Sequence, residues 1–173
     1  TVEAVLLRVR LEDGTIGWGE ANTPIGPEVT GLIGERLLLP IVRGRAFADP
    51  PALWDFLYDA QRGRGYAAGY FLDALGALDI AVWDALGQRS GSPVAALLCE
   101  TPREEIPAYL SGLRQATLDQ RIATMQRWAD GGIQGIKIFL DGDLDAGEKE
   151  LAALQRASGD RIDQWMVDTL WMC

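Results

Sequence analysis

The chain has no histidine and only two cysteines among its 173 residues. A Ser-His pair, a histidine base and a histidine metal ligand are therefore excluded within this stretch. Cys99 and Cys173 lie too far apart in sequence to form a short-spaced metal motif. We expect both thiols to be reduced and without a structural role, which favours a cytoplasmic protein.

Basic residues and long apolar runs are also scarce. Sixteen Lys and Arg residues stand against 25 Asp and Glu residues, giving a formal net charge of −9. Because phosphate binding needs clustered basic side chains, we expect no nucleic-acid partner. No apolar run approaches the roughly 18 residues of a membrane span, and no signal-peptide pattern opens the chain, so we expect no membrane partner. An apolar content of 48% with 24% charged residues is ordinary for a folded protein.

The first half of the chain begins with extended structure and continues with helices. Residues 4–11 and 16–20 flank the turn signal Glu12-Asp13-Gly14-Thr15, which predicts a β-hairpin. Four segments are expected after it: a loop from Asn22 to Gly31, and helices from Leu32 to Leu39 (ended by Pro40), from Pro51 to Arg62 and from Tyr70 to Gly87. Small residues in the last helix, such as Ala77 and Ala81, would let another element approach closely.

The second half alternates short apolar runs with helical patterns. The expected strands are Ile106–Leu110, Gly135–Phe139 and Gln164–Val167, and the expected helices are Leu118–Asp130 and Asp145–Ala157. This rhythm predicts parallel βα units. A polar connector, Thr101 to Glu105, is the predicted domain boundary. We therefore expect an α+β domain in residues 1–102 and an α/β domain in residues 103–173.

Two ionisable residues fall near the carboxyl ends of the predicted parallel strands, where function usually lies in such folds. Lys137 is inside GIKIF, and Asp168 closes QWMVD. The residues alone favour a solvated Asp168 that caps the following loop. Lys137 is equally compatible with a cation beside a substrate and with an ion-paired lysine at the strand ends.

Five motifs follow one another in a specific order: GTIGWGEA, ALDIAVWDALGQRSGSPVAALL, IPAYLSGL, GIKIF and MVD. In this order and spacing the chain resembles the enolase superfamily, in its mandelate racemase and muconate-lactonising branch, over nearly its whole length. The resemblance implies an α+β capping domain followed by an incomplete α/β barrel of the TIM type, (β/α)₇β. It also implies a Mg²⁺ cofactor and removal of the proton α to the carboxylate of a small carboxylic acid. We further expect a homo-oligomer.

Residue by residue, the resemblance makes Asp168 the first of three carboxylate metal ligands and Lys137 the first lysine of a catalytic Lys-x-Lys pair. Phe139 stands where the second lysine, usually the base on one face, would be. The substrate-covering loop of the capping domain corresponds to Ala21–Gly31, which includes Asn22, Thr23, Pro24 and Ile25. After Asp168, a small residue and then Asn are common, whereas this chain has Thr169, Leu170 and Trp171.

Three functions remain open at this point. The first is a racemase or dehydratase of a hydroxy or sugar acid; the second is a cycloisomerase or dipeptide epimerase of the same superfamily. The third is a non-catalytic relative used for binding or assembly, because Phe139 cannot take a proton. We expect the chain to be a piece of a longer protein and to be inactive alone, since a TIM barrel needs about 250 residues.

Overall fold

A computed structural model describes residues 3–140 and 142–170, so Trp171 and Cys173 lie outside the described residues. The chain divides into two compact units, Thr1–Pro102 and Arg103–Cys173, and each is described here by itself. The first contains a two-stranded antiparallel sheet with helices, and the second a three-stranded parallel sheet with helices. The class predicted for each half, α+β and then the start of an α/β barrel, is confirmed.

The first unit opens with the predicted hairpin. Strand β1 (Val5–Arg10) pairs with β2 (Ile16–Ala21) in antiparallel register, with Val5 opposite Ala21 and Arg10 opposite Ile16. The turn between them is closed by Asp13, whose Oδ1 accepts a hydrogen bond of 2.9 Å from the Thr15 N–H. Buried and exposed residues alternate along β2, as a strand with one covered face requires.

The long helix α4 (Tyr70–Ser90) packs directly against β2, and small residues make this possible. A Cβ atom at Gly19 would overlap the Ala77 carbonyl, and one at Gly17 would overlap the Ala81 carbonyl. The predicted close approach to α4 is therefore confirmed, and β2 is the element that approaches. A hydrogen bond of 2.8 Å from the Trp18 N–H to Asp84 Oδ2 ties strand and helix together.

The segment between the hairpin and α3 (Pro50–Arg62) differs from the prediction. Helix α1 (Pro27–Ile33), the π-helical segment η1 (Gly34–Leu38) and α2 (Leu39–Val42) follow one another without a break. The predicted loop to Gly31 is therefore wrong from Pro27 onward, and Pro40 does not end the helix. Proline has no N–H and crowds the carbonyl four residues earlier, and the wider π turn just before α2 is how a helix relieves that conflict.

Helix α4 also runs past its predicted end. It continues to Ser90 and stops at Gly91, which has a φ of 65°. Gly87 instead lies inside the helix, where an added Cβ would be 3.1 Å from the Ser92 carbonyl oxygen, because the chain turns back there into α5 (Val94–Leu98). Although α4 has 21 residues, no helix among residues 3–140 and 142–170 is long and apolar enough to cross a membrane.

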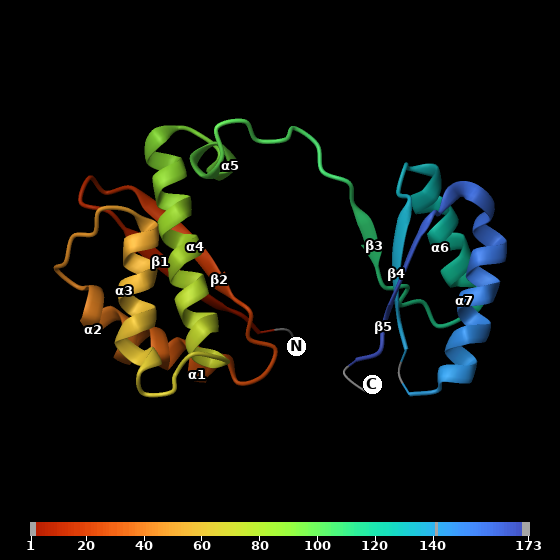
Figure 1. The fold of residues 1–173 in the computed structure, drawn as a ribbon, viewed down its shortest axis with the longest axis horizontal. Helices are drawn as coiled ribbons and strands as arrows, with labels where there is room; N and C mark the ends of the chain where they lie inside the picture. Colours follow the sequence, from red (N-terminus) through yellow and green to blue (C-terminus); the bar gives the residue numbers. More distant parts are fainter. Residues whose placement is uncertain (1–2, 141, 171–173) are drawn as a thin grey trace. The chain divides into compact units, whose positions relative to one another are not determined.

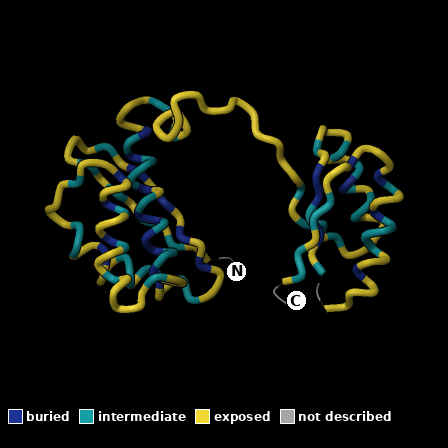
Figure 2. The backbone as a smooth tube through the Cα atoms, in the orientation of Figure 1, coloured by how far each residue is buried: buried dark blue, intermediate teal, exposed yellow. Residues whose placement is uncertain are grey.

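The second unit is a parallel sheet in the order β3-β4-β5, made of Tyr109–Ser111, Gly135–Phe139 and Gln164–Asp168. Helices α6 (Leu118–Asp130) and α7 (Leu144–Ser158) cover one face of it (Figure 1). The first strand is shorter and later than predicted, because its pairing with β4 begins only at Tyr109, opposite Gly135. Buried residues of this unit cluster between the sheet and the helices: Met125, Ile136, Ile138, Leu154 and Ile162 (Figure 2).

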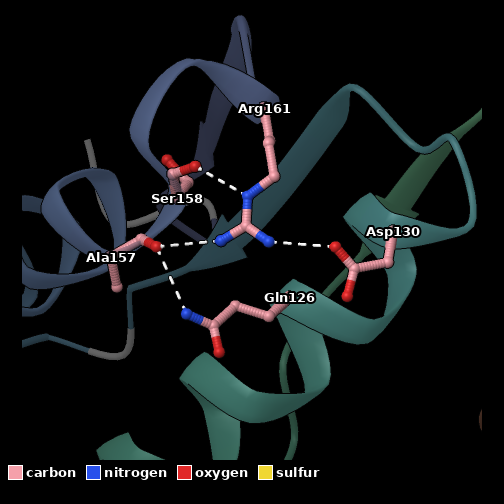
Figure 3. Close-up of polar contacts among 5 residues, drawn as sticks. All are labelled: Gln126, Asp130, Ala157, Ser158 and Arg161. Carbon is pink, nitrogen blue, oxygen red and sulfur yellow. Dashed lines mark hydrogen bonds and ion pairs between the residues drawn. The ribbon is translucent and has the colours of Figure 1, made fainter.

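Arg161 joins the ends of the two helices (Figure 3). It lies in the short helix η2 (Gly159–Arg161) and donates to the Ser158 and Ala157 carbonyls at the end of α7. Its third contact is an ion pair of 2.9 Å with Asp130, the last residue of α6. Since the last carbonyls of a helix have no partners within the helix, Arg161 supplies a donor to two of them, and Gln126 of α6 also donates to the Ala157 carbonyl.

Candidate functional site

Among the described residues of the second unit, the helices cover one face of the sheet, and the candidate site residues lie on the other, helix-free face (Figure 1). Along β4, Ile136 and Ile138 point into the core beneath the helices, so Lys137 and Phe139 point to the opposite face. In the parallel register Phe139 is opposite Asp168, which ends β5. Lys137, Phe139 and Asp168 therefore share the helix-free face at the carboxyl ends of the strands.

Lys137 and Asp168 are in direct contact. The distance from Lys137 Nζ to Asp168 Oδ2 is 2.7 Å, and each side chain is 28% exposed. The structure thus brings together the two residues that the sequence analysis singled out. It also gives Lys137 the carboxylate partner that the ion-pair alternative predicted.

Backbone groups hold Asp168 on its other side. The Leu170 N–H donates to Asp168 Oδ1 at 2.9 Å, and the Leu140 N–H donates to the Asp168 carbonyl at 2.9 Å. Leu170 has a φ of 52°, which is uncommon for a residue with a branched side chain. Such a conformation suits Asn better than Leu, and Asn is the residue that the family resemblance placed near this position. The backbone after Asp168 is therefore strained at the site.

The contact shifts the protonation of both groups toward the charged forms. The hydrogen bond to Asp168 raises the pKa of Lys137 above its usual 10.5, with attraction from Asp168 adding to it against some desolvation. The hydrogen bond from Lys137 lowers the pKa of Asp168 below its usual 3.8, and the Leu170 N–H lowers it further. At neutral pH the pair is therefore an ammonium and a carboxylate.

Phe139 contacts the same ammonium. Lys137 Nζ lies 5.3 Å from the centroid of the Phe139 ring, within cation–π range, and Phe139 as a residue is 38% exposed. The ring rests against Gly112, where a Cβ would be 2.9 Å from its Cε2 atom. Sequence reasoning missed Gly112. Its one signal is that a glycine comes two residues after the first predicted strand, and glycine can mark a place where backbones approach closely.

A divalent cation fits Asp168 as one ligand. An ionised carboxylate has about four acceptor positions on its two oxygens, and the contacts with Lys137 and Leu170 occupy one position on each oxygen. Oxygen is the donor that Mg²⁺ prefers. In the described ranges 3–140 and 142–170, however, no group of three acidic, cysteine or histidine side chains could hold a metal ion.

The predicted substrate-covering loop lies in the first unit, between β2 and α1. Asn22, Pro24 and Ile25 are exposed there, whereas Thr23 is only 5% exposed. The Thr23 hydroxyl has no hydrogen-bond partner within the described part of the chain. Three of the four side chains are therefore exposed on the first unit, whereas Thr23 belongs to the interior of that unit.

With this geometry in place, the chain can be assigned to a family of enzymes. Residues 1–99 match the family model for the N-terminal domain of mandelate racemase and muconate lactonizing enzymes. The chain belongs to this family, within the enolase superfamily, as the sequence analysis expected.

Two curated relatives show how much of such a protein is present. The chain is 28% identical over 163 residues to a D-galactarolactone cycloisomerase of Agrobacterium fabrum, covering 90% of this chain and 41% of the relative. It is 29% identical over 173 residues to an L-rhamnonate dehydratase of Saccharopolyspora erythraea, covering 97% and 41%. The chain therefore spans about two fifths of the length of these relatives.

Solved structures agree with the fold. A crystal structure of an enolase-superfamily member from Agrobacterium tumefaciens superimposes with a TM-score of 0.89 and 37% identity, covering 98% of this chain and 43% of that one. A mandelate racemase/muconate lactonizing protein from Paracoccus denitrificans complexed with magnesium gives a TM-score of 0.78 and 28% identity, covering 96% and 47%. Magnesium is therefore present in a structurally similar relative.

Proposed function

We propose that the intact protein is a Mg²⁺-dependent enzyme that removes the proton α to the carboxylate of a hydroxy or sugar acid, as a dehydratase or racemase. The observation that carries this proposal is the contact of 2.7 Å between Lys137 and Asp168. It lies on the helix-free face of the sheet, at the carboxyl ends of the strands, in a chain of this family. This is the end of a parallel βα fold at which substrates bind.

Each residue has a part that follows from its chemistry. Asp168 contributes one carboxylate ligand to the cation. Mg²⁺, when bound, is a hard Lewis acid that neutralises negative charge developing on a substrate oxygen. Lys137, held as an ammonium, binds and orients the substrate carboxylate and offsets its charge. The remaining metal ligands would come from the part of the intact protein beyond these residues.

Phe139 stands where the family resemblance expects a base, so the base is sought elsewhere. Phe139 has no ionisable group, and the hydrogen bond to Asp168 raises the pKa of Lys137, which favours its ammonium form. We propose that the base comes from the opposite side of the substrate, on another element of the intact protein. Relatives named as a cycloisomerase and a dehydratase support a reaction on an acid sugar or its lactone. A cycloisomerase of the same superfamily is therefore the alternative to a dehydratase or racemase.

The test is α-proton exchange by the intact protein. Hydroxy and sugar acids are incubated with protein and Mg²⁺ in deuterated water, and loss of the α-proton signal or appearance of product is followed by NMR. We expect at least one acid to react, and we expect Lys137→Met to weaken the reaction much more than Lys149→Met. Lys149 is a matched control, because it is the other lysine of the chain and lies exposed on α7. A broad library with no reacting acid would refute the proposal.

A second candidate function, a non-catalytic relative that binds or assembles, is favoured by one observation. Phe139 places a ring where the family resemblance expects a base, and the ring packs well against Gly112. Titration of the intact protein with Mg²⁺ distinguishes the two. Tight binding that is lost in Asp168→Asn supports the enzyme, whereas absence of tight binding supports the non-catalytic relative.

A further inference from the structure

We propose that Phe139, seated on Gly112, is a positioning residue that keeps the Lys137 ammonium on Asp168, ready to bind the substrate carboxylate. The proposal rests on the proposed function, which gives Lys137 its substrate. It gives Phe139, which occupies the position expected for a lysine base, a different role in substrate binding.

A lysine needs such a restraint because its ammonium sits on a flexible four-carbon stem. The side chain of Lys137 is 28% exposed, and its Nζ has a partner on one side, Asp168 at 2.7 Å. Phe139, two residues along the same strand and on the same face, provides a second contact, with its ring centroid 5.3 Å from Nζ. The ammonium therefore contacts both a carboxylate and the electron-rich face of an aromatic ring.

Gly112 fixes where the ring can lie. Its N–H donates a hydrogen bond of 2.8 Å to the Lys137 carbonyl, which joins the end of β3 to β4. Its φ of 83° favours glycine, and a Cβ there would be 2.9 Å and 3.2 Å from the Phe139 Cε2 and Cδ2 atoms. A glycine at this position therefore permits the positive φ of the backbone and also leaves space for the Phe139 ring.

A purely space-filling role makes a different prediction. If the ring only covered apolar surface, leucine would replace it without changing Lys137. If the ring holds the ammonium, then tyrosine preserves the effect and leucine removes it. Gly112→Ala would also displace the ring, and Gly132→Ala is its matched control. Gly132 has a φ of 95° with no atom within 4 Å of an added Cβ, so it introduces backbone strain without touching the ring.

The first measurement is independent of activity. Lysine labelled with ¹³C at the ε position is incorporated into the intact protein, and the Lys137 signal is assigned with Lys137→Arg. We expect ring-current displacement of the Lys137 ε-protons relative to Lys149, retained in Phe139→Tyr and Gly132→Ala. We expect it to be lost in Phe139→Leu and Gly112→Ala. No displacement in the wild-type protein would overturn the proposal.

The second measurement is kinetic, on whichever acid the exchange screen identifies. Lys137 binds the carboxylate in both the ground state and the transition state, so loss of its positioning raises KM and leaves kcat nearly unchanged. From the size of cation–π interactions at exposed sites, we expect a rise of about two- to fivefold in KM for Phe139→Leu, with Phe139→Tyr close to wild type. An unchanged KM in Phe139→Leu, or a Tyr variant as impaired as the Leu variant, would overturn the proposal. If no acid reacts, the proposed function fails, while the NMR comparison still decides whether the ring holds Lys137.

Discussion

Replacement of Gly19 by alanine tests the packing of the first unit most sharply. Gly19 lies in β2 with a φ that is not left-handed, so alanine is acceptable to its backbone. The added Cβ, however, would overlap the Ala77 carbonyl on α4. Because the obstacle is backbone within a long helix, it cannot move aside as a flexible side chain would.

Two opposing effects set the magnitude. Overpacking of a tight contact costs about 1–3 kcal/mol. Replacing glycine by alanine also restricts the unfolded chain, which returns about 0.4–1 kcal/mol. We therefore expect a net loss of about 1–2 kcal/mol in the free energy of unfolding of the first unit.

Hydrogen exchange of the α4 amides is the assay, because it reports on the first unit separately, with the α7 amides as an internal reference. A loss of this size lowers α4 protection about 5- to 30-fold. Gly76→Ala is the matched control, since Gly76 lies within α4 and an added Cβ meets no atom within 4 Å. We expect that variant to gain about 0.5–1 kcal/mol from helix propensity. Equal behaviour of the two variants would refute the packing argument.

Three further predictions concern the second unit. Because folding lowers the pKa of Asp168, its ionised carboxylate stabilises the fold above pH 3.8, and this stabilisation is lost as the pH falls through the lowered pKa. Because folding raises the pKa of Lys137, its ammonium stabilises the fold below pH 10.5, and this stabilisation is lost as the pH rises through the raised pKa. Melting temperatures measured against pH should therefore decline less at acid pH in Asp168→Asn than in wild type. Arg161→Ala should cost about 1–2 kcal/mol in urea unfolding, since two helix-end carbonyls lose a charged donor along with the Asp130 ion pair. Leu170→Asn should stabilise the unit by about 1 kcal/mol in the same assay, because Asn adopts positive φ more easily.

Each of these has a specific counter-result. An acid limb that is identical in wild type and Asp168→Asn, with Asp160→Asn as a surface control, would mean that the ion pair is not formed in solution. If Asp130→Ala lowers the free energy of unfolding as much as Arg161→Ala does, the hydrogen bonds from Arg161 to the helix-end carbonyls do not contribute to stability. A destabilised Leu170→Asn would show that the leucine side chain outweighs backbone strain.

The sequence predicted the elements of the fold whose formation depends on neighbouring residues. The hairpin follows from alternation and a turn signal, and the βα units follow from apolar runs between helical periods. The prediction failed at Pro40, because whether a proline ends a helix depends on the turn before it. Here a π-helical turn precedes the proline, and it includes Leu38, which is fully buried in the core of the first unit. That packing involves residues distant in sequence and is not visible in the local pattern.

The candidate site could be predicted in part. Lys137 and Asp168 were identifiable because strand ends in parallel βα units carry function, and the register of β4 and β5 brings them together. The seat of Phe139 on Gly112 could not be predicted, since it depends on the exact exit of the chain from β3. Thr23 likewise lies in a segment that the sequence predicts to be a loop, and only tertiary packing shows that its side chain is buried.

The most direct test of the proposed chemistry is α-proton exchange by the intact protein, compared between wild type and Asp168→Asn on the same acid. The protein is treated with a chelator and then supplied with Mg²⁺. We predict that the wild-type protein exchanges the α-proton only when Mg²⁺ is restored, and that Asp168→Asn exchanges at least a hundredfold more slowly, roughly the loss expected for removing one group that stabilises developing charge. Undiminished exchange in Asp168→Asn, or exchange that ignores Mg²⁺, would contradict the assignment of Asp168 as a metal ligand and with it the mechanism proposed here.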